Sequence, residues 1–473
     1  ALADAKMDSV PIIMISGQVP VSMIGTDAFQ EMDTYGMTIP ATKHNFLVRN
    51  ASELPEIITE AYRVARDCRP GPVVIDLPKD VQKQIVDIDT EYTPAAETVC
   101  CDDFDTDAIG KITERINTAQ RPVLYIGGGV ILSGASNEVQ ELAMTSTIPV
   151  VSSLMGLGAF PGDHQLFVGM IGMHGDYHTN HFMQEADLII ALGVRFDDRA
   201  TGKVDEFCPD ASIIHIDIDE SEIDKILPSM MKLEADVKAA LRAINPLIEK
   251  RQRPEWIQRL NELKQTYPVV RDDDETLASP EHICRLISGE SPEGTIITTD
   301  VGQHQMWAAR ILTLTRPRSF LTSGGLGTMG FGLPAAIGAA AANPGKRVIC
   351  ITGDGSLLMN IQELATLADL GSNVAIVVFN NQALGLVRQQ QELFFNENYF
   401  ASEFATGPDF RMLAESFGIR AVRLKAGDEA DFAEQLRMTG PVLIDIPVDP
   451  SKKVFPIVPP GSANIQLIGG KTS

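Results

Sequence analysis

The sequence predicts an α/β protein with central parallel sheets flanked by helices. Short apolar runs rich in β-branched residues alternate with helix-like segments along all 473 residues. Several of these runs are apolar at successive positions, which is the pattern of strands covered on both faces. Strands that alternate with helices in this way form parallel sheets, because each helix returns the chain across the sheet.

Ten segments are expected to be strands. In chain order they are Pro11–Ile15, Pro72–Asp76, Pro122–Ile126, Ile148–Ser152, Leu188–Leu192, Ser212–Asp217, Thr295–Thr299, Arg347–Thr352, Val374–Phe379 and Val442–Ile446. Isoleucines at helical spacing predict a helix over Asp107–Ala119. Ser279 and Pro280 are typical of a helix start, as N-cap and first-turn proline, and Asn360–Leu370 is also expected to be helical.

Two polar segments, Glu91–Asp107 and Glu249–Ser279, are expected to be linkers. They divide the chain into three predicted domains, residues 1–95, 105–260 and 275–473. The length fits this division at about 150 residues per domain. The first domain is expected to be incomplete, because the opening ALADAKMDSV has no initiator Met and runs at once into a strand-like segment.

Composition narrows the class of protein. Hydrophobic residues make up 44% and charged residues 22%, as in ordinary globular proteins. The 39 basic and 63 acidic residues give a net charge of −24, which disfavours nucleic-acid binding. No apolar run reaches the ~18 residues of a membrane span, and the start lacks a signal peptide's apolar region. The six cysteines show no metal-binding spacing, which favours reduced thiols in a cytoplasmic protein.

The most informative chemistry follows two apolar strands. Gly353-Asp354-Gly355-Ser356 ends one of them, and Asn380-Asn381 ends the next. A glycine-rich turn lets backbone N–H groups approach a phosphate, and a carboxylate with an amide and a backbone carbonyl can hold Mg²⁺. Adjacent parallel strands would bring both segments to one sheet edge. The alternative is that each segment is an ordinary turn.

A second glycine run, Gly127-Gly128-Gly129, follows the strand Pro122–Ile126 and suits the close approach of a dinucleotide. Asp217, at the end of another strand, could meet ribose hydroxyls. A plain loop is an equally good interpretation of the three glycines.

Longer motifs make the pattern specific: GQHQMW (302–307), LTSGGLGTMGFGLPAAIGAA (321–340), GMIGMHG (169–175), RFDDRATGK (195–203) and IGTDAFQE (24–31). With the GDG and NN segments, they resemble the catalytic subunits of acetolactate synthases, also called acetohydroxyacid synthases. DVGQHQMWAAR and VPPGSAN are most similar to the bacterial isozyme I type. The resemblance covers nearly the whole chain and implies three domains of the kind found in thiamine-diphosphate (ThDP) enzymes.

The family's activity is the decarboxylation of pyruvate and ligation of the product to a second 2-keto acid, pyruvate or 2-ketobutyrate. These are early steps of valine, leucine and isoleucine synthesis. The resemblance implies ThDP and Mg²⁺ as cofactors and FAD in a structural, non-redox role. It also implies small 2-keto acids as substrates, a homodimer or larger assembly with ThDP sites between subunits, and a small regulatory subunit.

The resemblance also assigns residues. The diphosphate would be lined by Val301, Gly302, Gln303, His304, Gly355 and Ser356, and Mg²⁺ would be held by Asp354, Asn381 and the carbonyl of Ala383. Gly327 and Met329 would lie beneath the bent cofactor, although Met329 could equally be a gap-filling core residue. FAD would contact Gly127, Gly128, Gly129, Arg69, Ser153, Leu154, Met173, His174, Arg195, Asp217, Ile218, Asp236, Val237, Gly324 and Gly325; His174 could also be a satisfied loop histidine.

Arg199 and Lys79 are expected near the substrate entrance, because a basic side chain matches the carboxylate of a 2-keto acid. A surface ion pair is the alternative for each. Gln18 in SGQV would face the active site.

Two departures from the family pattern stand out. The glutamate that activates the cofactor belongs to a segment upstream of ALADAKMDSV, so the chain as written is expected to be inactive. Gln390 stands where many members carry a Trp against the second substrate, which puts a strong preference for 2-ketobutyrate in doubt. Another ThDP/FAD enzyme, such as a pyruvate oxidase, and a catalytically silent paralogue are the alternatives.

Overall fold

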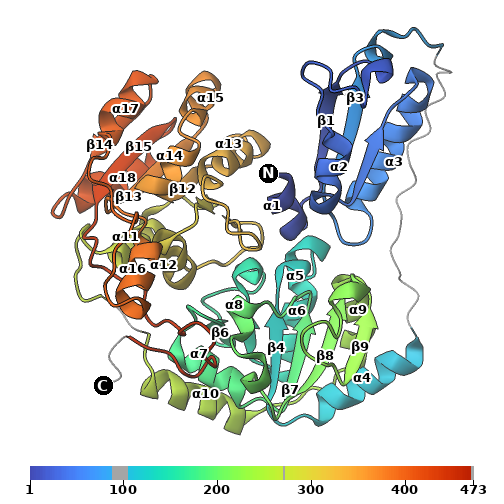
Figure 1. Ribbon diagram of the computed structural model, residues 1–473. Coiled ribbons are helices and arrows are strands. Elements are labelled where there is room, and N and C mark those ends of the chain that lie inside the picture. Colours follow the sequence, from blue (N-terminus) through green and yellow to red (C-terminus); the bar gives the residue numbers. More distant parts are fainter. Residues whose placement is uncertain (88–104, 270–271, 470–473) are drawn as a thin grey trace. The chain divides into compact units, whose positions relative to one another are not determined.

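The computed structural model describes residues 1–87, 105–269 and 272–469. Three parallel sheets lie between helices (Figure 1). The chain forms two compact units, residues 1–103 with 324–327 and residues 104–323 with 328–473. One sheet belongs to the first unit and two belong to the second. The α/β class with parallel sheets flanked by helices is confirmed.

The first unit contains a three-stranded sheet with the order β1-β3-β2. Its strands are β1 (Ile13–Gln18), β2 (His44–Leu47) and β3 (Val73–Pro78), and its helices are α1 (Leu2–Met7), α2 (Thr34–Thr38) and α3 (Leu54–Arg66). Val73 and Ile75 of β3 pack with Ala61 and Ala65 of α3. The central position of β3 explains why it is the most completely buried strand of this sheet.

The second unit begins with a six-stranded sheet of order β6-β5-β4-β7-β8-β9. The strands are β4 (Pro122–Ile126), β5 (Val150–Ser152), β6 (Phe167–Met170), β7 (Leu188–Leu192), β8 (Ser212–Asp217) and β9 (Met231–Glu234). The helices are α4 (Thr106–Thr118), α5 (Gly128–Ser133), α6 (Ser136–Ser146), α7 (Tyr177–Gln184), α8 (Asp198–Thr201), α9 (Val237–Ile244) and α10 (Pro254–Thr266).

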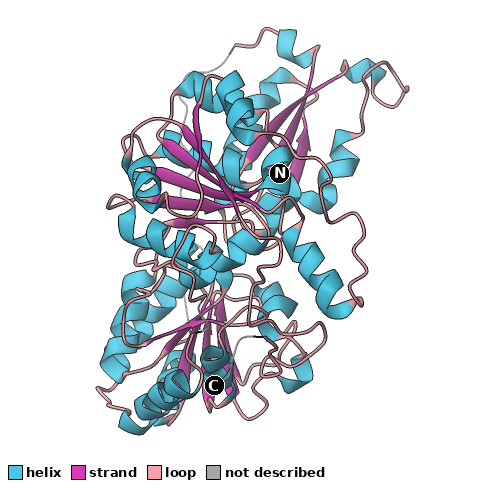
Figure 2. Cartoon of the chain, turned by 90° about the vertical axis from the view of Figure 1, so that its left-hand side faces the viewer, coloured by secondary structure: helices cyan, strands magenta, loops and turns pink. Residues whose placement is uncertain are grey.

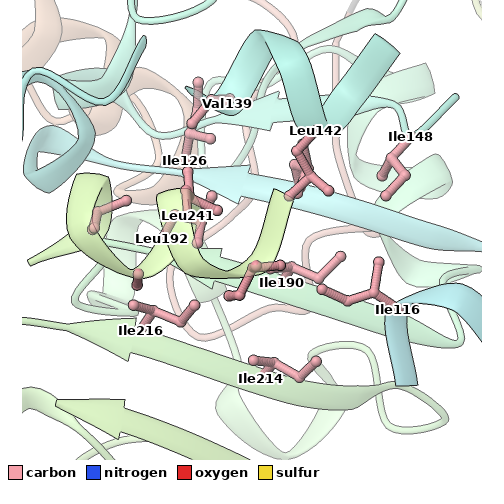
Figure 3. Close-up of a cluster of buried hydrophobic side chains, with 14 of the residues drawn as sticks. Ile116, Ile126, Val139, Leu142, Ile148, Ile190, Leu192, Ile214, Ile216 and Leu241 are labelled. Carbon is pink, nitrogen blue, oxygen red and sulfur yellow. The ribbon is translucent and has the colours of Figure 1, made fainter. Parts of the chain in front are cut away.

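Both faces of this sheet are buried, and alternate residues of each strand serve opposite faces. In β4, Leu124 and Ile126 join a core with α4, α6 and α9, part of which is drawn in Figure 3. Val123 and Tyr125 point into a second core, formed with α7 and α10. This double burial is why β4 is apolar at successive positions.

The other sheet of the second unit has the order β11-β10-β12-β13-β15-β14, with helices on both faces (Figure 2). Its strands are β10 (Ile296–Thr299), β11 (Phe320–Leu321), β12 (Val348–Gly353), β13 (Val374–Asn380), β14 (Arg420–Arg423) and β15 (Val442–Pro447). Its helices are α11 (Pro280–Glu290), α12 (Gln303–Ile311), α13 (Gly332–Ala342), α14 (Asp354–Met359), α15 (Glu363–Leu370), α16 (Gly385–Phe394), α17 (Phe410–Ser416) and α18 (Glu429–Arg437).

All ten expected strands are present, with ends that shift by up to three residues. Five further strands, β2, β6, β9, β11 and β14, were not expected from the sequence. Each of them lies at the edge of its sheet. Each of the five has only two to four residues, which is too few to form a recognisable apolar run.

The helix predictions also need correction. Ser279 caps α11 as expected, by accepting a hydrogen bond from the N–H of His282. The helix expected over Asn360–Leu370 begins only at Glu363, because Asp354 already starts a separate short helix. The linker expected over 91–107 lies mostly outside the described residues.

The expected linker Glu249–Ser279 is wrong in part, since it contains the 13-residue helix α10. Trp256, Leu260 and Leu263 recur at helical spacing and are buried in the core shared with α7. The Trp256 ring stacks on Phe182 at 4.0 Å between centroids, and its Nε1–H donates to the carbonyl of Pro122 at 3.0 Å. The helix is therefore an integral layer of the central sheet, hidden in the sequence by the charged residues on its outer face.

Within the described part of the chain, no helix combines the length and apolar character needed to cross a membrane. The described cysteines, Cys68, Cys208, Cys284 and Cys350, are all free thiols.

Replacing the Trp256 side chain tests whether α10 belongs to the central sheet. We expect Trp256→Ala to lower the free energy of unfolding of the second unit by about 3–5 kcal/mol, because a stacked and hydrogen-bonded ring is lost. Denaturant unfolding followed by circular dichroism measures this loss. Gln258→Ala, on the exposed face of α10, is the matched control and should change it by less than about 0.5 kcal/mol. Equal effects of the two variants would contradict the assignment.

Candidate functional site

The candidate site lies where three neighbouring parallel strands end. β10, β12 and β13 are adjacent, so the segments that follow them meet at one edge of the sheet. These segments are 301–304, 354–356 and 381–383, which are the residues expected to hold the diphosphate and the metal. In open α/β sheets this edge is where ligands bind.

Asp354 is a buried carboxylate with one unsatisfied oxygen. It is 3% exposed, and its Oδ1 accepts a hydrogen bond from the N–H of Gly355 at 2.8 Å. Its Oδ2 has no hydrogen-bond partner among the described residues. Burial raises the pKa of Asp354 to about 6. A cation beside Oδ2 would satisfy this oxygen and favour the charged form.

Asn381 and Ala383 complete the oxygen donors at this place. Asn381 Oδ1 accepts from the N–H of Ala383 at 3.1 Å and keeps a second lone pair. One carboxylate, one amide oxygen and a backbone carbonyl are the ligand types that Mg²⁺ accepts. In the described ranges no group of three or more His, Cys, Asp or Glu side chains could hold a metal, so a metal here depends on amide and carbonyl oxygens.

His304 and Ser356 border the same edge. Burial lowers the pKa of His304 to about 3, so its imidazole is neutral near pH 7. Its Nε2 has no partner in the described part of the chain. The Ser356 hydroxyl donates to the carbonyl of Val301 at 3.0 Å, which joins the ends of β10 and β12. A cavity of about 190 Å³ lies beside Asp354, with Gln382 and other residues in its wall.

Asp300 is a residue of this edge that sequence reasoning missed. Its carboxylate accepts hydrogen bonds from the N–H groups of Gly330 at 2.8 Å and Gly332 at 3.2 Å. These two residues flank the turn after Met329, so Asp300 fixes the loop that carries this methionine. Gly330 has a φ of +93°, and a Cβ there would lie 2.8 Å from the Asn360 amide, so only glycine fits.

Gln18 and Lys79, which are expected near the substrate, belong to the first unit. Gln18 ends β1, and its Nε2 donates to the carbonyl of Met32 at 2.7 Å and to Asp76 Oδ2 at 3.1 Å. The N–H of Lys79 donates to the carbonyl of Gln18 at 3.0 Å, and the Lys79 side chain is exposed. The ends of β1 and β3 therefore bring Gln18 and Lys79 together.

Arg69 and the glycines at 324, 325 and 327 also belong to the first unit. Arg69 Nε donates to the Ser9 hydroxyl at 2.9 Å. The N–H of Gly325 donates to Asp8 Oδ1 at 2.6 Å. The contact of Gly325 with Asp8 holds the 324–327 segment against the N-terminal residues.

The remaining residues expected to bind FAD follow the strands of the central sheet. Every one of its six parallel strands ends at such residues: Gly127–Gly129 after β4, Ser153 and Leu154 after β5, Met173 and His174 after β6, Arg195 after β7, Asp217 and Ile218 at the end of β8, and Asp236 and Val237 after β9. The fold thus gathers residues that are far apart in the sequence at one edge. This common edge agrees with a dinucleotide site there.

Close packing by itself explains two of the three consecutive glycines. The N–H of Gly127 donates to the carbonyl of Leu192 at 3.0 Å, and the N–H of Gly129 donates to that of Gly193 at 3.1 Å. A Cβ on Gly129 would lie 2.6 Å from the Cα of Gly193. The glycines let the turns after β4 and β7 touch, whether or not a dinucleotide binds.

His174 lies between the central sheet and the last one. Burial lowers its pKa to about 3. It lines a cavity of about 140 Å³ together with Asp176 and Arg310. Asp176 and Arg310 form a buried ion pair at 2.6 Å, which joins the start of α7 to α12.

Arg199 is accessible, as a substrate-binding cation would be. Its side chain is 67% exposed, and its nearest carboxylate, Asp198, lies 3.8 Å away. Asp197 instead caps α8 by accepting from the N–H of Arg199 at 3.1 Å. The Arg199 guanidinium also lies 3.7 Å from the Met173 sulfur, so the structure brings these two expected residues together.

The C-terminal segment holds the helix of Arg199 in place, a contact that the sequence did not indicate. The Asn464 amide donates to the carbonyl of Ala200 at 2.6 Å, and the N–H of Lys203 donates to the carbonyl of Ser462 at 3.0 Å.

Gln390 is half-buried on α16, next to the fully buried Gln389. Sequence reasoning singled out Gln390 and overlooked its neighbour.

Comparison with known proteins identifies the family. Residues 300–446 match the family described as "Thiamine pyrophosphate enzyme, C-terminal TPP binding domain", and residues 109–244 match "Thiamine pyrophosphate enzyme, central domain". Thiamine pyrophosphate is another name for ThDP. The first match contains all three segments at the edge of β10, β12 and β13.

The chain is similar over almost all of its length to large subunits of acetolactate synthases. It is 49% identical to "Acetolactate synthase isozyme 1 large subunit" of Escherichia coli (strain K12) over 99% of this chain and 83% of that protein. It is 42% identical to "Acetolactate synthase isozyme 2 large subunit" of the same organism, over 99% and 84%. For "Probable acetolactate synthase large subunit" of Methanocaldococcus jannaschii the identity is 44%, over 99% and 81%. The resemblance predicted from the motifs is confirmed: the chain belongs to the family of acetolactate synthase large subunits, which are ThDP-dependent enzymes.

Proposed function

We propose that this protein, an acetolactate synthase by family, decarboxylates pyruvate and joins the product to a second 2-keto acid. Pyruvate as acceptor gives 2-acetolactate, and 2-ketobutyrate gives 2-aceto-2-hydroxybutyrate. The observation that carries the proposal is the unsatisfied Asp354 oxygen at the shared edge of β10, β12 and β13. It lies in the segment that matches the TPP-binding domain.

The residues at this edge fit a diphosphate and its metal. Asp354, Asn381 and the carbonyl of Ala383 would hold Mg²⁺, because they offer oxygen ligands of the right kind. The backbone of 301–303, His304 and Ser356 would border the diphosphate at the start of α12, where helix N–H groups favour negative charge. When bound, ThDP supplies the carbon that adds to the keto group and accepts the electrons released with carbon dioxide.

The chain's own groups would handle the substrate. Arg199 is exposed and weakly paired, so its guanidinium can bind the carboxylate of a 2-keto acid. Lys79 and Gln18 of the first unit would also act on the substrate, as the resemblance implies. Met329 lies in the loop whose Gly330 and Gly332 donate to Asp300, and it would support the cofactor from below. An apolar site poor in water favours decarboxylation, because the reaction removes a charge.

We further propose FAD at the carboxyl edge of the central sheet, in a structural role because the reaction has no net redox change. The support is the arrangement of the expected residues after all six strands. The large-subunit family also supports an oligomer and a small regulatory subunit. A cytoplasmic location agrees with the four free cysteines.

The Asp354 carboxylate provides the first test of the proposal. We expect the full-length protein with Mg²⁺ and FAD to form acetolactate from pyruvate, and to bind ThDP only when Mg²⁺ is present. Asp354→Ala should abolish the Mg²⁺-dependent part of ThDP binding in calorimetry while the circular dichroism spectrum stays unchanged. Asp369→Ala, at an exposed position on α15, is the matched control and should bind ThDP normally. Unchanged ThDP affinity in Asp354→Ala would refute the metal site.

Acceptor choice tests the role of Gln390. Pyruvate and 2-ketobutyrate differ by one methylene, which a pocket can discriminate by only about 1–3 kcal/mol. A flexible amide offers little apolar surface to the extra methyl group, so both products should form nearly in the ratio of the substrates. Gln390→Trp should shift the ratio toward 2-aceto-2-hydroxybutyrate, whereas Gln390→Ala should not. Product analysis with both acceptors present measures this, and a strong 2-ketobutyrate preference in the unchanged protein would show that another residue sets specificity.

A further inference from the structure

Three side-chain amides form a continuous chain from the candidate metal site into the core. Gln389 on α16 and Gln303 at the start of α12 are 1% and 4% exposed. Gln303 Nε2 donates to Gln389 Oε1 at 2.9 Å. Asn381 Nδ2 donates to Gln303 Oε1 at 3.3 Å. The hydrogen bonds therefore run from Asn381 through Gln303 to Gln389.

The backbone of Val454 sets the direction of this chain. The N–H of Val454 donates to Gln389 Oε1, and Gln389 Nε2 donates to the carbonyl of Val454, both at 2.9 Å. A backbone N–H can only donate and a carbonyl can only accept, so the Gln389 amide has one possible orientation. Its oxygen then receives Gln303 Nε2, which also donates to the carbonyl of Lys452 at 3.0 Å.

With its nitrogen used in this way, Gln303 presents its oxygen to Asn381. The Asn381 nitrogen must face that oxygen, which turns Asn381 Oδ1 toward Ala383 and away from Gln303. The distinction matters because an amide binds Mg²⁺ through its oxygen only. The N–H of Ala383 and the Oε1 of Gln303 require the same orientation of the Asn381 amide, and Gln303 in addition holds this side chain in its place.

We propose that Gln389 is a positioning residue that acts through Gln303 to keep the oxygen of Asn381 available to Mg²⁺. The inference rests on the proposed function, which supplies the metal. It extends the site from its ligands to a buried residue that touches neither metal nor cofactor. Groups behind metal ligands commonly tune affinity in this way.

Gly385, the first residue of α16, makes room for the decisive contact. A Cβ at this position would overlap Gln303 Oε1 and Asn381 Nδ2. The glycine therefore allows the two amides to meet. A larger residue at 385 would disrupt the contact between Gln303 and Asn381 and leave the Gln389 side chain unchanged.

The test is calorimetric titration of Mg²⁺ into the full-length protein at saturating ThDP. We expect Gln389→Met, similar in size but without the amide, to weaken Mg²⁺ binding by about 10- to 100-fold. In its neutral form, Gln389→Glu keeps both contacts, because its carbonyl oxygen accepts from Gln303 and its O–H donates to the carbonyl of Val454, so its Mg²⁺ affinity should stay within about threefold of the unchanged protein. Gln391→Met is the matched control, because the Gln391 amide bonds to Phe400 and Ser402 instead. Its Mg²⁺ affinity should not change.

Gly385→Ala provides an independent variant in case Gln389→Met does not fold, and it should weaken Mg²⁺ binding to a similar degree. Unchanged Mg²⁺ affinity in either variant would overturn the proposal. Equal weakening by Gln389→Met and Gln389→Glu would also overturn it, because general loss of packing would then be the cause. If ThDP binding by the unchanged protein needs no Mg²⁺, the proposed function itself fails, and the positioning role fails with it.

Discussion

The parallel register of β10, β12 and β13 is the constraint on which the candidate site depends. Thr299 of β10 lies beside Ile351 of β12, and Gly353 of β12 lies beside Phe379 of β13. β10 therefore ends two residues before β12, β12 and β13 end within one residue of each other, and the polar residues that follow the three strands share one edge. Because the strands are buried on both faces, this edge is the first place along each strand where polar groups can gather.

Two buried carboxylates at this edge show how the same chemistry takes different roles. The oxygens of Asp300 receive N–H groups from the Met329 loop, so its charge is compensated within the chain. Asp354 keeps an oxygen without a partner in the described residues, although it is equally buried. A buried carboxylate in that state is costly unless a ligand completes it. Asp300 therefore holds the Met329 loop in place, whereas Asp354 has an oxygen that can bind a cation.

The sequence predicted the inner strands well because burial on both faces makes them apolar throughout. It missed five of the six edge strands, which have only two to four residues each, and the helix carrying Trp256, whose exposed face is charged. The residues proposed to bind the diphosphate and the metal followed from motifs, and the structure places them at one edge. Asp300 and Gln389 could not be predicted in this way, because their roles depend on hydrogen bonds to distant parts of the sequence. Asp300 accepts from Gly330, and Gln389 bonds to the backbone of Val454.

We propose that ThDP and Mg²⁺ bind at the edge formed by β10, β12 and β13. Amide hydrogen exchange of the full-length protein, with and without ThDP and Mg²⁺ together, tests it most directly. Exchange at 301–304, 354–356 and 381–385 should become slower when both are added, and should change little at these segments when Mg²⁺ is withheld. Unchanged exchange at all three segments, with protection appearing only at the central sheet, would contradict it.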